Sequence, residues 1–177
     1  TMTAATTTPT EALTFRGRPF ALAWRSVAIA WSKDKARPVL DHSVAIEVFD
    51  HGIRLISTDS YVLLHSWVPT DEYQGEAPTL DEMPTGGTFI AQDSYGRSIG
   101  LMAHVLNLTS EDDAPPIDVV LTVGEMEDDG STFVGMERSC ATLAVSDQEV
   151  LRLPLVEGEF PQWRGLLGGF SPRFNLS

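Results

Sequence analysis

The apolar residues between positions 20 and 31 recur with the spacing of an α-helix. The series consists of Phe20, Trp24, Val27 and Trp31. Because residues at this spacing share one face, the pattern predicts a helix over residues 20–31 that packs this face against a sheet. Leu22 and Ile29 fall outside that face and indicate a second contact surface, such as a neighbouring helix. Pro38 stops any continuation of the helix.

Three segments after this helix have the β-branched and apolar content of strands. They cover residues 39–48, 53–57 and 62–68, with short polar turns between them. Residues 70–87 contain prolines, glycines and several acids, which is typical of a long loop.

A similar order of elements then recurs. A short strand at 88–91 precedes a helix that Asp93 or Ser94 can cap and that runs to about Leu108. The predicted buried face of this helix consists of Ile99, Met102, Ala103 and Leu106. Further strands are predicted at 117–123, 132–136, 141–145 and 149–156.

The repeated order predicts an α+β domain of two pseudo-symmetric strand-helix-three-strand halves, at about 13–69 and 87–156. Two helices would pack on antiparallel sheet. We expect one domain over 13–167 and a disordered N-terminal arm over 1–12. Residues 168–177 are expected to be a linker and the truncated start of a following domain.

The charge of the chain is distributed unevenly. The formal net charge is −13, yet residues 16–37 carry six of the twelve cations and a single acid. A basic stretch on an acidic body is typical of a local anion-facing surface, although a solvated helix face with chance clustering remains the alternative.

Candidate catalytic chemistry is absent from the sequence patterns. The four histidines lack metal-ligand spacing, and no serine lies in a nucleophile elbow. The single cysteine, Cys140, excludes an internal disulfide and is expected to be a buried structural thiol in a cytoplasmic protein. No apolar run is long enough to cross a bilayer. We therefore expect no catalytic residues, no metal and no cofactor, and a protein that is not an enzyme.

Three segments together resemble one family. Residues 155–167, with Phe160, Pro161 and Trp163, resemble the strand end L-V-D-G-x-[FY]-P-D-[YW] of the DNA polymerase III beta subunit, the bacterial sliding clamp. Residues 56–63 are similar to the A-T-D-G-H-R-L turn of that family, and residues 36–40 to its R-P-x-L segment. The sequence departs from the family at several motif positions, so it resembles a divergent clamp domain, of the kind a phage could encode. Whether it corresponds to a first or a middle domain stays open.

The resemblance implies the DNA clamp fold and a function in DNA replication as a processivity factor. Six such domains form a ring around double-stranded DNA without sequence specificity. The full-length protein would be a homo-oligomeric ring that works with a clamp loader and DNA polymerase, in the cytoplasm of a bacterial or phage-infected cell. The DNA-binding candidates are Arg25, Lys33, Lys35, Arg37 and Arg97. Arg37 matches a family position, whereas helix geometry alone suggests Arg25 and Arg97.

The resemblance also implies a hydrophobic cleft for short peptides of polymerases and repair proteins. Its residues here would be Leu40, Thr58, Ser60, Tyr61, Val62, Leu63, Pro161 and Leu166. Val62 stands where the family has a basic residue, so this chain cannot make the interactions of that cation. The alternative is a clamp-like protein–protein interaction module without a DNA role, which the net negative charge favours.

Overall fold

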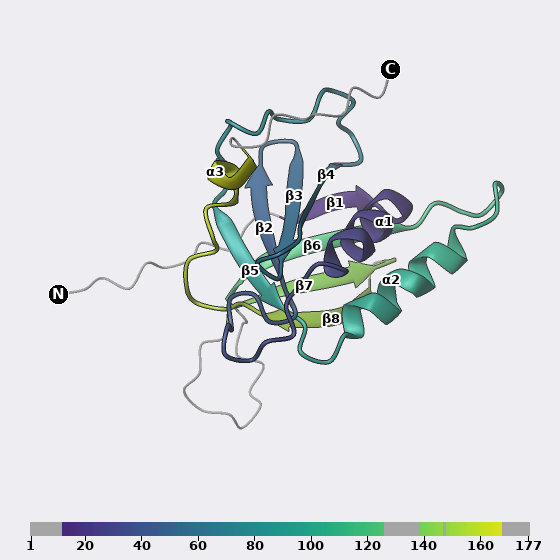
Figure 1. Cartoon of the computed structure of the whole chain (residues 1–177). Helices are drawn as coiled ribbons and strands as arrows, with labels where there is room; N and C mark the ends of the chain where they lie inside the picture. Colours follow the sequence, from purple (N-terminus) through teal and green to yellow (C-terminus); the bar gives the residue numbers. More distant parts are fainter. Residues whose placement is uncertain (1–11, 126–138, 147, 168–177) are drawn as a thin grey trace, which may run out of the picture.

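A computed structural model of the chain describes residues 12–125, 139–146 and 148–167. The elements follow one another in two similar series (Figure 1). The first series is β1 (Leu13–Arg16), α1 (Gly17–Ala28), β2 (Ser43–Phe49), β3 (Gly52–Thr58) and β4 (Leu63–Pro69). The second is β5 (Thr88–Gln92), α2 (Arg97–Leu108), β6 (Asp118–Glu125), β7 (Ser139–Val145) and β8 (Gln148–Pro154), followed by the short helix α3 (Trp163–Leu167). The predicted α+β class and the predicted recurrence are confirmed.

The two series exchange their first strands. One four-stranded antiparallel sheet has the order β1-β6-β7-β8, and the other has the order β4-β3-β2-β5. Leu13 of β1 lies opposite Leu121 of β6, and Gln92 of β5 lies opposite Ser43 of β2. Each sheet therefore contains a strand from the other half, and neither half forms its sheet alone.

The main hydrophobic core lies between the two sheets and the paired helices α1 and α2, which run close together in Figure 1. The predicted face of α1 is buried here, since Phe20, Trp24 and Val27 are each at most 1% exposed. Met102 and Val105 of α2 join the same core, together with apolar residues of both sheets.

Helix α1 begins and ends earlier than the periodicity predicted. It starts at Gly17, because Pro19 fits the first turn of a helix, where its missing N–H is not needed. It ends at Ala28, so Trp31 lies beyond the helix, half-buried beside the ring of His42 at 5.3 Å between centroids. The second contact surface expected for Leu22 and Ile29 is wrong for these side chains, which are 48% and 82% exposed.

The N-cap residue of α2 is Gly96, which has no side chain, and Asp93, one of the two predicted caps, serves the first turn from three residues before it. The Asp93 carboxylate accepts the backbone N–H groups of Arg97 and Ser98 at 2.9 and 2.8 Å. The buried face was predicted only in part: Ser98, Met102 and Val105 are buried, while Ile99, Ala103 and Leu106 are half-buried. The buried side of α2 packs mainly against α1, and through Met102 and Val105 it joins the core that both sheets share.

Other predicted bounds also differ. Strand β2 begins at Ser43, not at residue 39, because residues 39–42 belong to a hydrogen-bonded loop. The predicted strand at 132–136, the predicted segment at 168–177 and all but the last residue of the predicted arm at 1–12 lie outside the described residues. Cys140 is buried, as expected.

The sheet β4-β3-β2-β5 is covered on both faces, which is why every residue of β2 and β3 is buried. Its second face carries a smaller apolar cluster of Ala45, Ile56 and Trp163, with Leu63 and Phe160 packed against it. We call this the outer face of the sheet. Helix α3 lies beside the end of β2 in Figure 1 and delivers Trp163 to this cluster.

Candidate functional site

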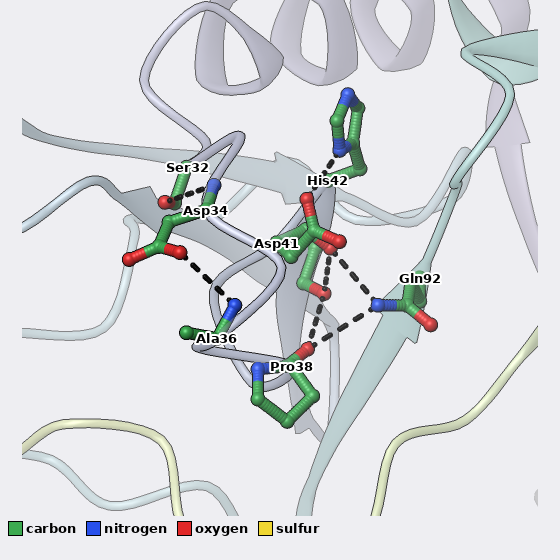
Figure 2. Close-up of polar contacts among 8 residues, drawn as sticks. Ser32, Asp34, Ala36, Pro38, Asp41, His42 and Gln92 are labelled. Carbon is green, nitrogen blue, oxygen red and sulfur yellow. Dashed lines mark hydrogen bonds and ion pairs between the residues drawn. The ribbon is translucent and has the colours of Figure 1, made fainter.

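The loop at residues 31–42, which follows α1, is held in a defined shape by its own polar groups (Figure 2). The Asp34 carboxylate accepts the N–H of Ala36 at 3.0 Å, and the Ser32 hydroxyl accepts the N–H of Asp34 at 3.0 Å. On the other side, the Gln92 amide of β5 donates to the carbonyls of Pro38 and Asp41 at 3.4 and 3.2 Å. The exposed cations Lys33 and Lys35 therefore project from an ordered loop.

A groove of about 690 Å³ runs between α1 and α2, and we call it the helix groove. Among the described residues that line it, the charged ones are Arg25 and Lys33, and none is an acid. Apolar side chains of both helices form its walls, including the exposed Ile29. An acid-free groove on a chain of net charge −13 is a local surface that favours anions.

The predicted DNA-binding residues divide between two places. Arg25 and Lys33 line the helix groove, and the guanidinium of Arg97 lies 5.4 Å from the ring of Tyr95 at the same groove. Arg37 is directed elsewhere. Its guanidinium donates a hydrogen bond to the Ser60 hydroxyl and lies 3.8 Å from the Asp34 carboxylate.

The turn between β3 and β4 is built by Thr58 and Asp59. The Asp59 carboxylate accepts the N–H groups of Tyr61 and Val62, both at 2.8 Å, and these bonds lower the pKa of Asp59. The Thr58 hydroxyl donates to the Val62 carbonyl at 2.7 Å and accepts the N–H of Ser60 at 3.1 Å. Ser60 has φ 82°, a left-handed conformation that glycine adopts most readily.

The predicted cleft residues come from three segments that contact one another. Leu63 packs with Phe160 and Trp163 on the outer face, which brings the 58–63 turn beside α3. The Leu40 N–H donates to the Arg37 carbonyl at 2.9 Å, and the Arg37 side chain reaches Ser60. Tyr61, Val62 and Leu166 are 94%, 50% and 64% exposed, and Pro161 is exposed, whereas Leu40 and Thr58 are buried. We call the eight predicted cleft residues the cleft face: Leu40, Thr58, Ser60, Tyr61, Val62, Leu63, Pro161 and Leu166.

Three charged residues next to the cleft face were not predicted from the sequence. Glu47, Arg54 and Arg164 meet on the outer face of the sheet, where the first two are almost fully buried. A glutamate and an arginine within otherwise apolar strands were the available signal, because buried charges need partners.

No arrangement suited to metal chemistry is present within the described part of the chain, where no three His, Cys, Asp or Glu side chains cluster. In the same residues, no helix is both long and apolar enough to span a membrane.

The fold is similar to solved structures of a DNA polymerase III beta subunit and a beta sliding clamp. The DNA polymerase III beta subunit of Thermotoga maritima superposes with a TM-score of 0.50 at 16% sequence identity. The beta sliding clamp of C. crescentus superposes with a TM-score of 0.51, also at 16% identity. The fold is that of a clamp domain. The matches cover 85% of this chain and 32% and 31% of those proteins, so the chain spans about a third of their length. No protein-family model matches this clamp-fold chain, and no curated protein matches its sequence.

Proposed function

We propose that the chain is a domain of a DNA sliding clamp, a non-enzymatic processivity factor that surrounds duplex DNA and tethers polymerase and other partners. In a full-length protein, several such domains would form a homo-oligomeric ring that a clamp loader places on DNA. The observation that carries the proposal is the helix groove, an acid-free surface with Arg25 and Lys33 in a clamp-fold chain that is otherwise strongly acidic.

The helix groove would attract DNA loosely. Exposed Lys and Arg side chains contact phosphates without reading the bases, and the bound counterions that they release make the affinity dependent on salt. Contacts of this kind let a protein slide along a duplex. The acidic remainder of the chain repels DNA from other surfaces.

The cleft face supports the tethering part of the proposal. Exposed apolar side chains, Val62 and Leu166, lie near a rigid turn and a short helix, and such a surface suits the apolar anchors of a short peptide. Arg37 is placed beside Ser60 at this face, so we assign it to peptide binding as well as to DNA.

The DNA part is tested by measuring the binding of a short fluorescent duplex to the chain over a range of salt concentrations. The variant Lys33→Gln/Lys35→Gln/Arg37→Gln is expected to flatten the plot of log affinity against log salt by up to about 0.9 for each phosphate that the variant no longer neutralises. Arg152→Gln is the control. Arg152 is exposed on β8 and alternates with the core-facing Leu153, so it lies on the side of the sheet away from the helices. An unchanged slope in the triple variant would contradict the proposed DNA contact.

One observation favours the rival function, a protein–protein module without a DNA role. Leu22 and Ile29 present apolar surface at the helix groove. Apolar side chains do not contribute to the binding of phosphate groups, so this surface suits a protein partner better than DNA. If the wild-type chain shows no salt-dependent affinity for the duplex while it binds peptides, the rival function is correct.

A further inference from the structure

A buried carboxylate on the outer face of the sheet is shared by two arginines. Glu47 of β2 lies directly opposite Arg54 of β3 in the strand register, and they are 3% and 2% exposed. The Arg54 Nη1 is 3.7 Å from the Glu47 Oε1. The second arginine comes from α3, far along the chain: Arg164 donates from Nη1 to Oε2 and from Nη2 to Oε1, both at 2.6 Å. A two-pronged contact of this kind fixes orientation as well as distance.

Arg164 also ties down the long loop between β4 and β5. Its Nε donates to the Leu80 carbonyl at 2.7 Å, and its Nη2 reaches the Glu82 carbonyl at 3.3 Å. The guanidinium lies 4.5 Å from the ring centroid of its neighbour Trp163. A helix as short as α3 is not stable by itself in water, so these contacts and the burial of Trp163 determine where it lies.

The two arginines depend on Glu47 unequally. Arg54 donates from Nη2 to the Pro78 carbonyl at 2.8 Å, but its Nε and Nη1 are buried without a hydrogen-bond partner among the residues that the structure describes. Burial lowers the pKa of Arg54, with the nearby charge of Arg164 acting in the same direction. Removing Arg164 leaves Arg54 and Glu47 as a pair, whereas removing Glu47 leaves two guanidinium groups without their shared carboxylate.

We propose that Glu47 and Arg164 are positioning residues for the cleft face: their buried ion pair holds α3 on the sheet, so that Pro161 and Leu166 stand where a peptide would meet them. This inference rests on the proposed peptide-binding function. Neither residue would touch the peptide. Glu47 is buried in the middle of the sheet, and both terminal nitrogens of the Arg164 guanidinium are already engaged.

The test compares Arg164→Gln and Arg164→Lys with the wild-type chain through two measurements. Amide hydrogen exchange of residues 163–166 reports whether α3 is held, and fluorescence anisotropy reports the affinity for a capped peptide with adjacent Leu and Phe side chains. For Arg164→Gln we expect α3 to exchange roughly ten- to a hundredfold faster, the range that charge-assisted hydrogen bonds supply, and the peptide to bind at least about tenfold more weakly. Arg164→Lys keeps the positive charge but loses the two-pronged guanidinium contact with Glu47. Its exchange rate and its peptide affinity should therefore lie between those of the wild type and Arg164→Gln.

The matched control is Arg18→Gln, which removes an exposed arginine of α1 whose Nη1 donates to the Thr109 carbonyl at 3.5 Å. In this control, the amide exchange of α3 and the affinity for the peptide should both equal those of the wild type. Exchange in β2 and β3 should also be unchanged in Arg164→Gln, because Glu47 keeps Arg54 as a partner.

A second variant separates the role of the carboxylate from the stability of the sheet. Glu47→Gln alone leaves the buried Arg54 close to the half-buried Arg164 without a carboxylate between them, and it is expected to fold poorly. The double variant Glu47→Gln/Arg54→Gln removes one cation with the carboxylate and places two amides opposite each other in the register. It should fold, yet loosen α3 to the same degree as Arg164→Gln.

Unchanged exchange in α3 of Arg164→Gln would overturn the inference, as would a loosened α3 with full peptide affinity. If the wild-type chain binds no peptide, the proposed tethering function fails instead. The exchange data then show separately whether the ion pair holds α3.

Discussion

The indole Nε1 of Trp24 donates a hydrogen bond of 2.8 Å to the hydroxyl of Ser98, and both side chains are fully buried. The Ser98 hydroxyl in turn donates to the Asp93 carboxylate at 2.5 Å. Trp24 lies on α1 and Ser98 on α2, so this chain of bonds joins the helices of the two halves through the residue that also binds the first turn of α2. A buried polar link between two apolar helices fixes their relative position.

Replacing Ser98 with alanine should destabilise the domain by about 1–3 kcal/mol, because the Trp24 N–H then has no partner in the core. Equilibrium unfolding in urea measures this free energy. Ser94→Ala, at an exposed serine before the same helix, should change it by no more than about 0.5 kcal/mol. Equal effects of the two substitutions would mean that the buried link contributes nothing.

Gly52 has no room for a side chain. A Cβ at this position would meet the Val68 carbonyl oxygen and come within 2.7 Å of the Trp67 ring. We expect Gly52→Ala to lower the free energy of unfolding by about 1–3 kcal/mol, the range for overpacked sites.

Gly100→Ala should instead raise the free energy of unfolding. The space around Gly100 is open within α2, and alanine favours a helix by about 0.8–1.0 kcal/mol over glycine. Thermal or urea unfolding of Gly52→Ala and Gly100→Ala shows whether the free energy of unfolding falls in the first variant and rises in the second.

His65 should make stability depend on pH. Partial desolvation of the His65 ring, which lies 5.3 Å from the Trp163 ring, followed by the positive charge of Arg54, lowers the pKa of His65 below its usual 6.5. The unfolded chain then takes up a proton near pH 6.5, whereas the folded chain takes it up only at lower pH. The contribution of His65 to stability is therefore present above about pH 6.5 and is lost as the pH falls toward the lowered pKa.

Urea unfolding between about pH 5 and about pH 7.5 tests this dependence. His65→Asn should flatten the rise of the free energy of unfolding with pH over this window. A titration of the His65 ring by NMR gives the pKa directly, and a midpoint at or above 6.5 would contradict the expected direction.

Ile29 offers a test of the helix groove that adds charge instead of removing it. This residue is 82% exposed at the end of α1, so Ile29→Lys should fold with little change in stability. If the groove faces DNA, the new cation should steepen the salt dependence of duplex binding by about 0.9 in the log–log slope. Val150→Lys, at an exposed position on β8, is the matched control and should leave the slope unaltered. Equal slopes for both variants and the wild type would remove the groove from the candidate DNA surface.

Local patterns in the sequence were sufficient for much of the fold. The spacing of Phe20, Trp24 and Val27 identified the buried face of α1, and Asp93 marked the start of α2. The order of the elements in the two halves was also readable, because helical and strand periodicity are properties of consecutive residues. The ends of elements were less readable: Trp31 continues the helical spacing in sequence, but the chain has already turned at Ile29 and Ala30.

For the candidate site, the residue types could be read from the sequence, whereas the contacts between distant residues appeared only in the tertiary structure. The turn chemistry of Thr58 and Asp59 was visible in the sequence, because it involves neighbours two to four residues apart. The contact of Arg37 with Ser60, 23 residues away, was not visible, and it puts the side chain of Arg37, predicted only as a DNA-binding residue, beside the cleft face.

The sequence by itself determined that this chain forms two similar series of strand, helix and strands, with a basic stretch on an acidic body. Only the tertiary structure decided that β1 and β5 exchange sheets and that Arg164 reaches Glu47 across 117 residues. The physical reason is the same in both cases. Hydrogen-bonding edges and buried charges require a partner, but the identity of that partner depends on which distant segments the collapse of the core brings together.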